Sequence, residues 1–203
     1  SLIANVMDGV GEPALIIEGS TSPHSFTLKP SHAKLLEEAD VIFWIGESIE
    51  TFMERPLESI VKNAEIVEFM EVESINKLKF REESIFEEHD DHDDHDDHGH
   101  DKEHDDHDDH DDHGHDDHAD HDHGEFDPHA WLSTDNARIW LNVIAAKLSS
   151  IDPANAGGYF ANASEAITEL DALDKEVNEM LDTVRGGKFI VFHDAYQYFE
   201  TVY

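Results

Sequence analysis

The sequence predicts an α/β protein with a parallel sheet, followed by a long helix and the start of a second lobe. Three observations lead to this prediction. Short apolar runs alternate with helical periodicity at the spacing of βαβ units. The run at residues 41–45 is apolar at every position, which is typical of a strand covered on both faces of a parallel sheet. A narrow apolar stripe along residues 152–184 predicts one long helix.

The first lobe is expected to span residues 1–150. Residues 1–10 have the apolar spacing of the end of an amphipathic helix. Apolar runs of strand length that are bounded by glycine, proline and polar residues are typical of buried strands. Three such runs are expected as strands, at residues 14–17, 41–45 and 64–69.

Helices are expected between these strands and after the last of them. We expect Ser31 to cap the first helix, and the second helix to be interrupted at Pro56. Ser133 or Thr134 can cap the last helix of the lobe. The apolar residues of that helix fall on one face: Ile139, Trp140, Val143, Ile144 and Leu148.

A linking helix and the start of the second lobe follow. Residues 152–185 are expected to form one rigid helix with Pro153 near its first turn. Its apolar residues recur at steps of three and four, which predicts one stripe along the helix: Phe160, Ala163, Ile167, Leu170, Leu173, Val177, Met180 and Val184. Residues 188–203 are expected to begin the second α/β lobe, with a strand at 188–192 and then a helix.

A tract of histidine and aspartate at residues 87–124 interrupts the first lobe. The string HDDHDDHDDHGHD occurs twice in it, beginning at His89 and at His104. So dense a charge cannot bury a core, and we therefore expect a disordered loop. An acidic linker would not need histidine, whereas imidazole beside carboxylate is a pairing found in metal sites. We predict that the tract gathers zinc weakly through its histidines: His89, His92, His95, His98, His100, His104, His107, His110, His113, His115, His118, His121 and His123.

Charge and composition exclude several classes of partner. The formal net charge is −36, and an acidic surface repels nucleic acid and anionic membranes. No apolar run reaches the length of about 18 residues that a membrane span needs. The absence of cysteine excludes disulfides and thiolate metal sites. Both ends of the sequence fall within apolar patterns, so a fragment is expected, and an export signal could have been lost from it.

Three of the four histidines outside the tract share a setting that suits a metal site. His24 and His193 each follow an apolar run, and His129 lies just before a capped helix. Ligands bind at the carboxyl ends of strands in open α/β sheets, where three imidazoles would suit Zn²⁺ and leave a fourth position for water or a carboxylate. The alternative is that each is a hydrogen-bonded loop residue. His32, in the first turn of a helix, is expected to be a solvated side chain.

Four sets of residues outside the tract form a recognisable series. They are SPHSF with LKPS at residues 22–31, ADVIFWIG at 39–46, DPHAWLS at 127–133 and FHDAYQYF at 192–199. Together they resemble the zinc-binding solute receptors of bacterial ABC importers, of the ZnuA type. The resemblance implies two α/β lobes joined by a rigid helix, with metal held between them by His24, His129 and His193. A His-rich loop at the position of the tract is also a feature of that family.

The sequence departs from this family in its candidate for a fourth ligand. Some relatives have an acidic residue where Pro23 stands, and others use a carboxylate late in the second lobe. The fourth ligand therefore stays open. Manganese-selective relatives usually have a carboxylate in place of His193, and a third imidazole favours zinc.

The resemblance predicts a receptor that captures Zn²⁺ in the cell envelope without catalysis. It would deliver the ion to the inner-membrane ABC permease of a zinc importer, and would be periplasmic or anchored by a lipid outside the cytoplasm. A monomer is expected. The alternatives are a manganese or nickel receptor of the same fold, a His-rich metal buffer or storage protein, and a zinc hydrolase. The hydrolase would need a general base, for which Asp194 is the only sequence neighbour.

Overall fold

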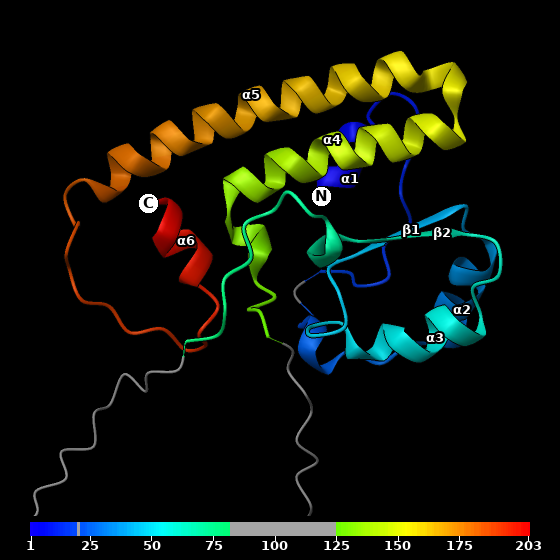
Figure 1. Ribbon diagram of the computed structural model, residues 1–203, viewed down its shortest axis with the longest axis horizontal. Coiled ribbons are helices and arrows are strands. Elements are labelled where there is room, and N and C mark those ends of the chain that lie inside the picture. The colour runs from blue at the N-terminus through cyan, green and yellow to red at the C-terminus, as the bar shows by residue number, and fades with distance from the viewer. Residues whose placement is uncertain (20, 82–124) are drawn as a thin grey trace, which may run out of the picture. The chain divides into compact units, whose positions relative to one another are not determined.

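The computed structural model describes residues 1–19, 21–81 and 125–203 (Figure 1). The loop predicted at 87–124, with its thirteen histidines, lies outside the described residues, so the predictions about it remain predictions. The chain divides into two units, one made of Ser1–Phe80 and His123–Tyr203 and the other of Arg81–Asp122. The account that follows concerns the first unit.

A two-stranded parallel sheet lies at the centre of the described fold. β1 (Val41–Trp44) pairs with β2 (Glu65–Glu68), and the register places Val41 opposite Glu65. The crossover between them contains a short 3-10 helix, Thr51–Met53, and α3 (Glu54–Ser59). Pro56 lies inside α3 and does not interrupt it, because the first turn of a helix has no intrahelical bond for proline to break. The predicted strands at 41–45 and 64–69 and the α/β class are confirmed.

Both faces of β1 are covered, as its uniformly apolar sequence predicts. Successive side chains of a strand point to opposite faces. Ile42 and Trp44 pack with Leu36, Met53 and Leu57 of the α2 and α3 side. The alternate residues of the strand pack on the other side, against the core formed with the long helices.

Helix α2 (Pro30–Glu38) begins one residue earlier than its predicted cap. Pro30 occupies its first position, where the fixed φ of proline suits a helix start, so the prediction of a Ser31 cap is wrong. The backbone N–H of Lys29 donates instead to Nδ1 of His32, at 3.2 Å. His32 is half-buried and closes the first turn of α2, so it is a structural residue rather than a solvated one.

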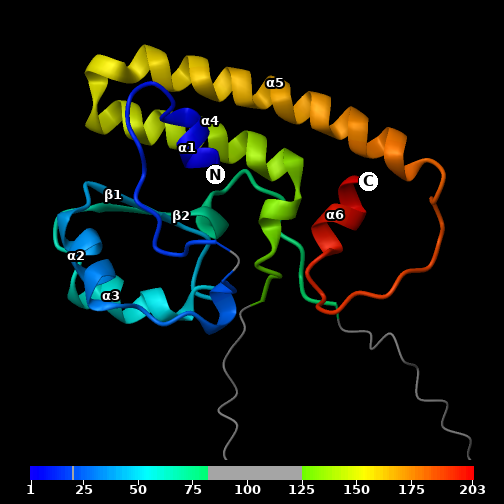
Figure 2. The same cartoon turned by 180° about the vertical axis from the view of Figure 1, so that it is seen from behind.

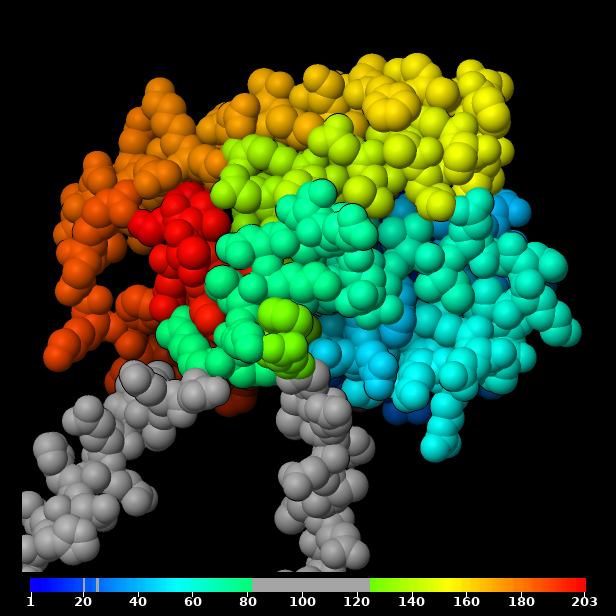
Figure 3. All heavy atoms as spheres, viewed as in Figure 1, coloured from blue at the N-terminus to red at the C-terminus, as the bar shows by residue number. Residues whose placement is uncertain are grey.

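Three helices form the layer that covers the other face of the sheet. Helix α4 (Thr134–Ile151) begins at Ser133, whose hydroxyl accepts from Asn136 N–H as predicted. The 3-10 helix Pro153–Asn155 joins it to α5 (Ala156–Leu181), and α1 (Leu2–Val6) packs against both long helices. Figures 1 and 2 show α5 running beside α4 from opposite viewpoints. On the face seen in Figure 3, the side chains of the two helices meet.

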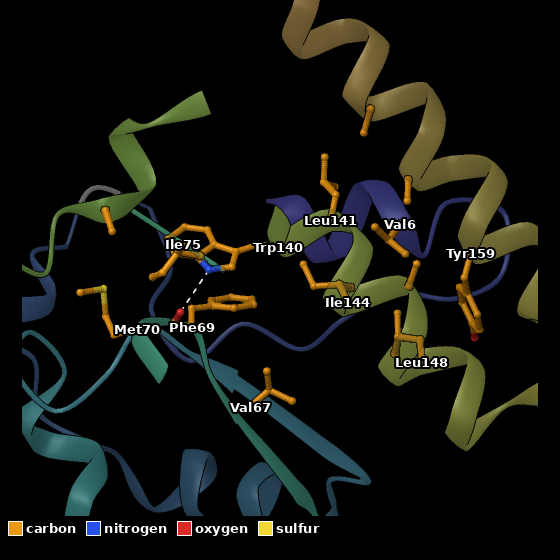
Figure 4. Packing of buried hydrophobic residues seen from close by; sticks show 14 of the residues in the cluster. Val6, Val67, Phe69, Met70, Ile75, Trp140, Leu141, Ile144, Leu148 and Tyr159 are labelled. Carbon is orange, nitrogen blue, oxygen red and sulfur yellow. Dashed lines mark hydrogen bonds between the residues drawn. The ribbon is translucent and has the colours of Figure 1, made fainter. Parts of the chain in front are cut away.

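The main core joins this helical layer to β2. Trp140 is 1% exposed and stacks on Phe69, with ring centroids 4.9 Å apart. Its indole N–H donates to the Phe69 carbonyl at 3.1 Å, which Figure 4 shows as a dashed line. Leu141 and Ile144 on the same helix are fully buried beside it, and Val67 faces them from β2 (Figure 4). The core thereby fixes the start of α4, on which the candidate site depends.

Two of the predicted strands are wrong. Residues 14–17 form no strand, and Leu15 is 53% exposed. This run and β1 line the same cavity of about 610 Å³. Residues 188–192 form no strand either, and Ile190 is fully exposed. The hydrogen bonds of a strand come from a neighbouring strand. Among the described residues no neighbour pairs with either run.

The apolar stripe of α5 is only partly buried. Ala163 is 1% exposed, but Phe160 is 49%, Leu173 is 44% and Met180 is 61% exposed. The buried positions of α5 are Tyr159, Ala163 and Ala166, where α1 and α4 pack on the helix. The helix ends at Leu181, and Val184 lies beyond it in turns. The linking role of this helix stays a prediction.

The insertion point of residues 82–124 is closed by pairing between the segments on either side. Lys79 forms an antiparallel bridge with Phe126, and its ammonium lies 2.6 Å from a carboxylate oxygen of Glu125. The Asp127 N–H donates to the Leu78 carbonyl at 2.8 Å. We call residues 78–79 and 125–127 the neck. Because the neck leads directly to His129, it holds one side of the candidate site.

Candidate metal centre

The structure brings together the three histidines singled out from the sequence. His24 lies on the 3-10 helix Pro23–Ser25, His129 precedes the 3-10 helix Ala130–Leu132, and His193 lies in the loop before α6 (Gln197–Val202). One ring nitrogen from each lies within 4.8 Å of the others. Within the described residues this is the only group of three or more histidine, aspartate or glutamate side chains spaced to hold a metal ion.

The spacing of the ring nitrogens fits a single small cation. Zn–N bonds of about 2.0–2.1 Å in a tetrahedron place the ligand atoms about 3.3 Å apart. Nε2 of His24 lies 3.4 Å from Nε2 of His129. Nε2 of His193 lies 2.9 Å from the same atom, so ligation would require it to move outward by about 0.4 Å. These two separations are therefore close to those of a ligating arrangement, and all three nitrogens lie within 4.8 Å of one another.

Asp127 fixes the orientation and the tautomer of His129. Both side chains are buried, and Oδ1 of Asp127 lies 2.6 Å from Nδ1 of His129. The same oxygen accepts from the His129 backbone N–H at 2.9 Å. Because an ionised carboxylate only accepts, Nδ1 carries the ring proton, and the lone pair of Nε2 points to the other two histidines. This carboxylate–histidine pairing is common behind metal ligands.

Sequence reasoning did not assign Asp127 a role of its own. The signal was present, because Asp127 precedes His129 by two residues and a short turn brings a carboxylate back onto the ring. Asn136 was missed as well. Its side chain accepts from Asn76 N–H and donates to the carbonyls of Asn76 and Ala130, so it holds the backbone that follows His129.

The His24 segment is held by aromatic packing rather than by burial. The Phe26 ring lies 5.0 Å from that of Phe52 and stacks on that of His32 at 5.5 Å. His24 is exposed, and its ring centroid lies 5.2 Å from that of His193. His32 therefore supports the segment and does not join the group.

The group contains no carboxylate among the described residues. Two acidic side chains, Glu50 and Glu68, instead contact the backbone at the carboxyl end of the sheet. Oε2 of Glu50 accepts from the backbone N–H groups of Ile45 and Gly46, at 2.6 and 3.3 Å. Burial raises the pKa of Glu50 and that of Glu68. Gly46, the last of these backbone donors, has φ +150°, a conformation that favours glycine.

Comparison with known proteins identifies the family of this chain. A sequence profile of the ZnuA family, zinc-uptake complex component A periplasmic, matches residues 1–203. The chain belongs to this family. The resemblance drawn from the four motifs is thus confirmed at the level of the ZnuA family. Over residues 1–19, 21–81 and 125–203, no helix has both the length and the apolarity needed to cross a membrane.

Individual ZnuA-family proteins show how far the likeness extends. The high-affinity zinc uptake system protein ZnuA of Brucella abortus (strain 2308) is 46% identical over 202 residues, which are 98% of this chain and 60% of that protein. The protein of the same name from Paracoccus denitrificans (strain Pd 1222) is 41% identical over 203 residues, covering 100% and 60%. A crystal structure of ZnuA superposes with a TM-score of 0.71 at 22% identity, over 100% of this chain and 62% of that one, and shows a shared fold. The chain spans about 60% of the length of the curated relatives that it matches.

Proposed function

We propose that this chain provides the ion-binding part of a receptor that captures Zn²⁺ through His24, His129 and His193. The observation that carries the proposal is the convergence of three ring nitrogens, one of them oriented by Asp127. Two features support zinc as the cargo. Three imidazoles suit zinc better than manganese, which prefers oxygen ligands. Curated relatives at 46% and 41% identity carry the name of high-affinity zinc uptake proteins.

His129 gives the site its fixed point. It is 4% exposed, and Asp127 holds its ring in the ligating tautomer before an ion arrives. Little side-chain freedom is therefore lost there on binding, which favours high affinity. His24 and His193 are exposed, so an ion can reach and leave the site through their side of it. We infer that release begins when one of these two imidazoles moves away.

We infer that the ion passes to an inner-membrane ABC permease in the periplasm. The description of the family as a periplasmic component of a zinc-uptake complex supports this inference. We further propose that the histidines of residues 87–124 bind additional zinc more weakly, since each ion there must order a length of chain. Neither role needs a chemical reaction on the cargo, so we propose a receptor rather than an enzyme.

Alanine variants of the three histidines test the proposal, with Lys34→Ala, at an exposed position of α2, as the control. Zinc is titrated in competition with a chelator that strips the weak sites and reports only the tightest event. Each of His24→Ala, His129→Ala and His193→Ala should weaken that event at least about tenfold, the cost of one lost ligand contact of about 1.4 kcal/mol. Lys34→Ala should leave it unchanged. Equal affinities in all four variants would contradict the proposal.

Deletion of residues 87–123 distinguishes the receptor interpretation from the alternative of a metal buffer. A receptor keeps one tight zinc event after the deletion, because the three histidines lie outside the deleted segment. A protein whose only function lies in the tract loses all tight binding. Competition between zinc and manganese on the same deletion variant then tests the choice of cargo, and tighter binding of manganese would overturn it.

A further inference from the structure

Helix α6 is hydrogen-bonded to the neck, chiefly through one buried hydroxyl. Tyr198 is 1% exposed, and its Oη accepts from the Leu78 N–H at 2.9 Å. The same hydroxyl donates to the Asp127 carbonyl at 2.8 Å. Gln197 adds a bond from Nε2 to the Lys79 carbonyl at 3.1 Å. Figure 3 shows the red helix packed against the green segment that precedes residue 82.

The hydroxyl of Tyr198 accepts one hydrogen bond and donates another, so a purely apolar ring cannot replace it. Burial raises the pKa of Tyr198, which keeps its proton available for the bond to Asp127. Phenylalanine would fill the same space but would leave the Leu78 N–H and the Asp127 carbonyl without this partner. Buried backbone groups are costly to leave unpaired.

The bonds of Tyr198 connect the segment that carries His129 with the helix that follows His193. Asp127, whose carbonyl accepts from Tyr198, also holds the ring of His129 through its carboxylate. His193 lies in the loop that leads into α6. The residues before His193 are not held by packing, since Ile190 and Phe192 are fully exposed. The position of the His193 imidazole therefore depends on where α6 is anchored.

We propose that Tyr198 is a positioning residue of the metal site, and that it sets the separation of His193 from His129. This inference rests on the proposed function. It predicts that the Tyr198 hydroxyl contributes to metal affinity through the placing of His193, although it touches neither the ion nor any ligand side chain.

The first test compares Tyr198→Phe with Tyr196→Phe in the full chain. Tyr196 lies two residues closer to His193 but is 42% exposed, so it controls for the loss of a hydroxyl nearby. Zinc affinity is measured by chelator competition. Tyr198→Phe should bind zinc about tenfold more weakly, because His193 loses its fixed position, and Tyr196→Phe should match the parent protein. Equal affinity of the two variants would overturn the inference.

A double-mutant cycle distinguishes positioning from general stability. If Tyr198 acts through His193, adding Tyr198→Phe to His193→Ala should cause no further loss of zinc affinity. A merely structural role would cost the same factor in both backgrounds, and that result would overturn the inference. The single variants also separate the two proposals. If His193→Ala does not weaken binding, the proposed function and the inference both fail. If His193→Ala weakens binding and Tyr198→Phe does not, only the inference fails.

Discussion

Nε2 of His129 lies 2.9 Å from Nε2 of His193, although the two residues are separated by 64 positions in the sequence. Nδ1 of His129 is occupied by Asp127, so Nε2 of His129 is the acceptor and His193 is the donor in this contact. An ion that enters must take the lone pair of His129, and His193 can ligate through Nε2 only if its own ring proton moves to Nδ1. Metal binding is therefore coupled to a change of tautomer in His193.

Replacing Asp127 should weaken metal binding without removing a ligand. We expect Asp127→Asn to lower zinc affinity by about tenfold or more, because a neutral amide supports the His129 ring less well than a carboxylate. Chelator competition measures the effect. Asp135→Asn is the matched control, since that carboxylate is 77% exposed on the first turn of α4. The same loss in both variants would show that charge alone, and not the bond to His129, matters.

Asn136 should be among the most sensitive polar residues of the fold. It is fully buried, and its amide bonds to Asn76 and Ala130. We expect Asn136→Leu to lower the free energy of unfolding by about 2–4 kcal/mol, because backbone partners are left unpaired. Urea denaturation measures this. Asn142→Leu, on an exposed position of the same helix, should cost less than about 1 kcal/mol, and comparable losses in the two variants would refute the assignment.

Two buried tryptophans differ in a way that can be tested. Trp140 donates to the Phe69 carbonyl, whereas Trp44 Nε1 is buried with no hydrogen-bond partner among the described residues. Trp140→Phe should therefore cost about 1–3 kcal/mol more in unfolding free energy than Trp44→Phe. Both substitutions remove a similar volume, so the difference reports on the bond. Equal costs in denaturant titrations would contradict this assignment.

Glu50 should make the fold more stable in mild acid than near neutrality. Burial raises its pKa above the ordinary value of 4.5, so the folded state holds this proton more tightly than the unfolded state. The stability from the protonated carboxyl is complete below pH 4.5 and is lost as the pH rises through the raised pKa. Glu50→Gln removes this loss, and its advantage in melting temperature over the parent should grow with pH above 4.5. Exposed Glu54 is the control, and a Glu54→Gln variant with the same pH trend would argue against Glu50 as the cause.

Local patterns in the sequence were sufficient to predict β1, β2 and α4. Each carries its own signal, such as the apolar run of the strand or the Ser133 cap of the helix. The runs at 14–17 and 188–192 have the same local signal and are not strands, because a strand also requires a neighbour to pair with. An apolar run of strand length is therefore not sufficient by itself to form a strand.

The metal group and its nearest support, Asp127, had signals in the sequence, whereas the support from Tyr198 had none. His24, His129 and His193 follow recognisable motifs, so their convergence could be expected. Asp127 reaches His129 through a short local turn, whereas Tyr198 acts through the backbone carbonyl of a residue far from it in the sequence. The Tyr198 contact depends on the packing of α6 against the neck, and no periodicity in the sequence expresses that packing.

The pairing of Lys79 with Phe126 has a consequence for how this protein can be tuned. Because the chain departs and returns through adjoining residues, repeats of the HDD type can be added or removed between them at a small entropic cost. His129 and its supporting carboxylate would not be displaced by such changes. Mutation can thus change the number of histidines between residues 82 and 124 separately from the geometry of the group formed by His24, His129 and His193.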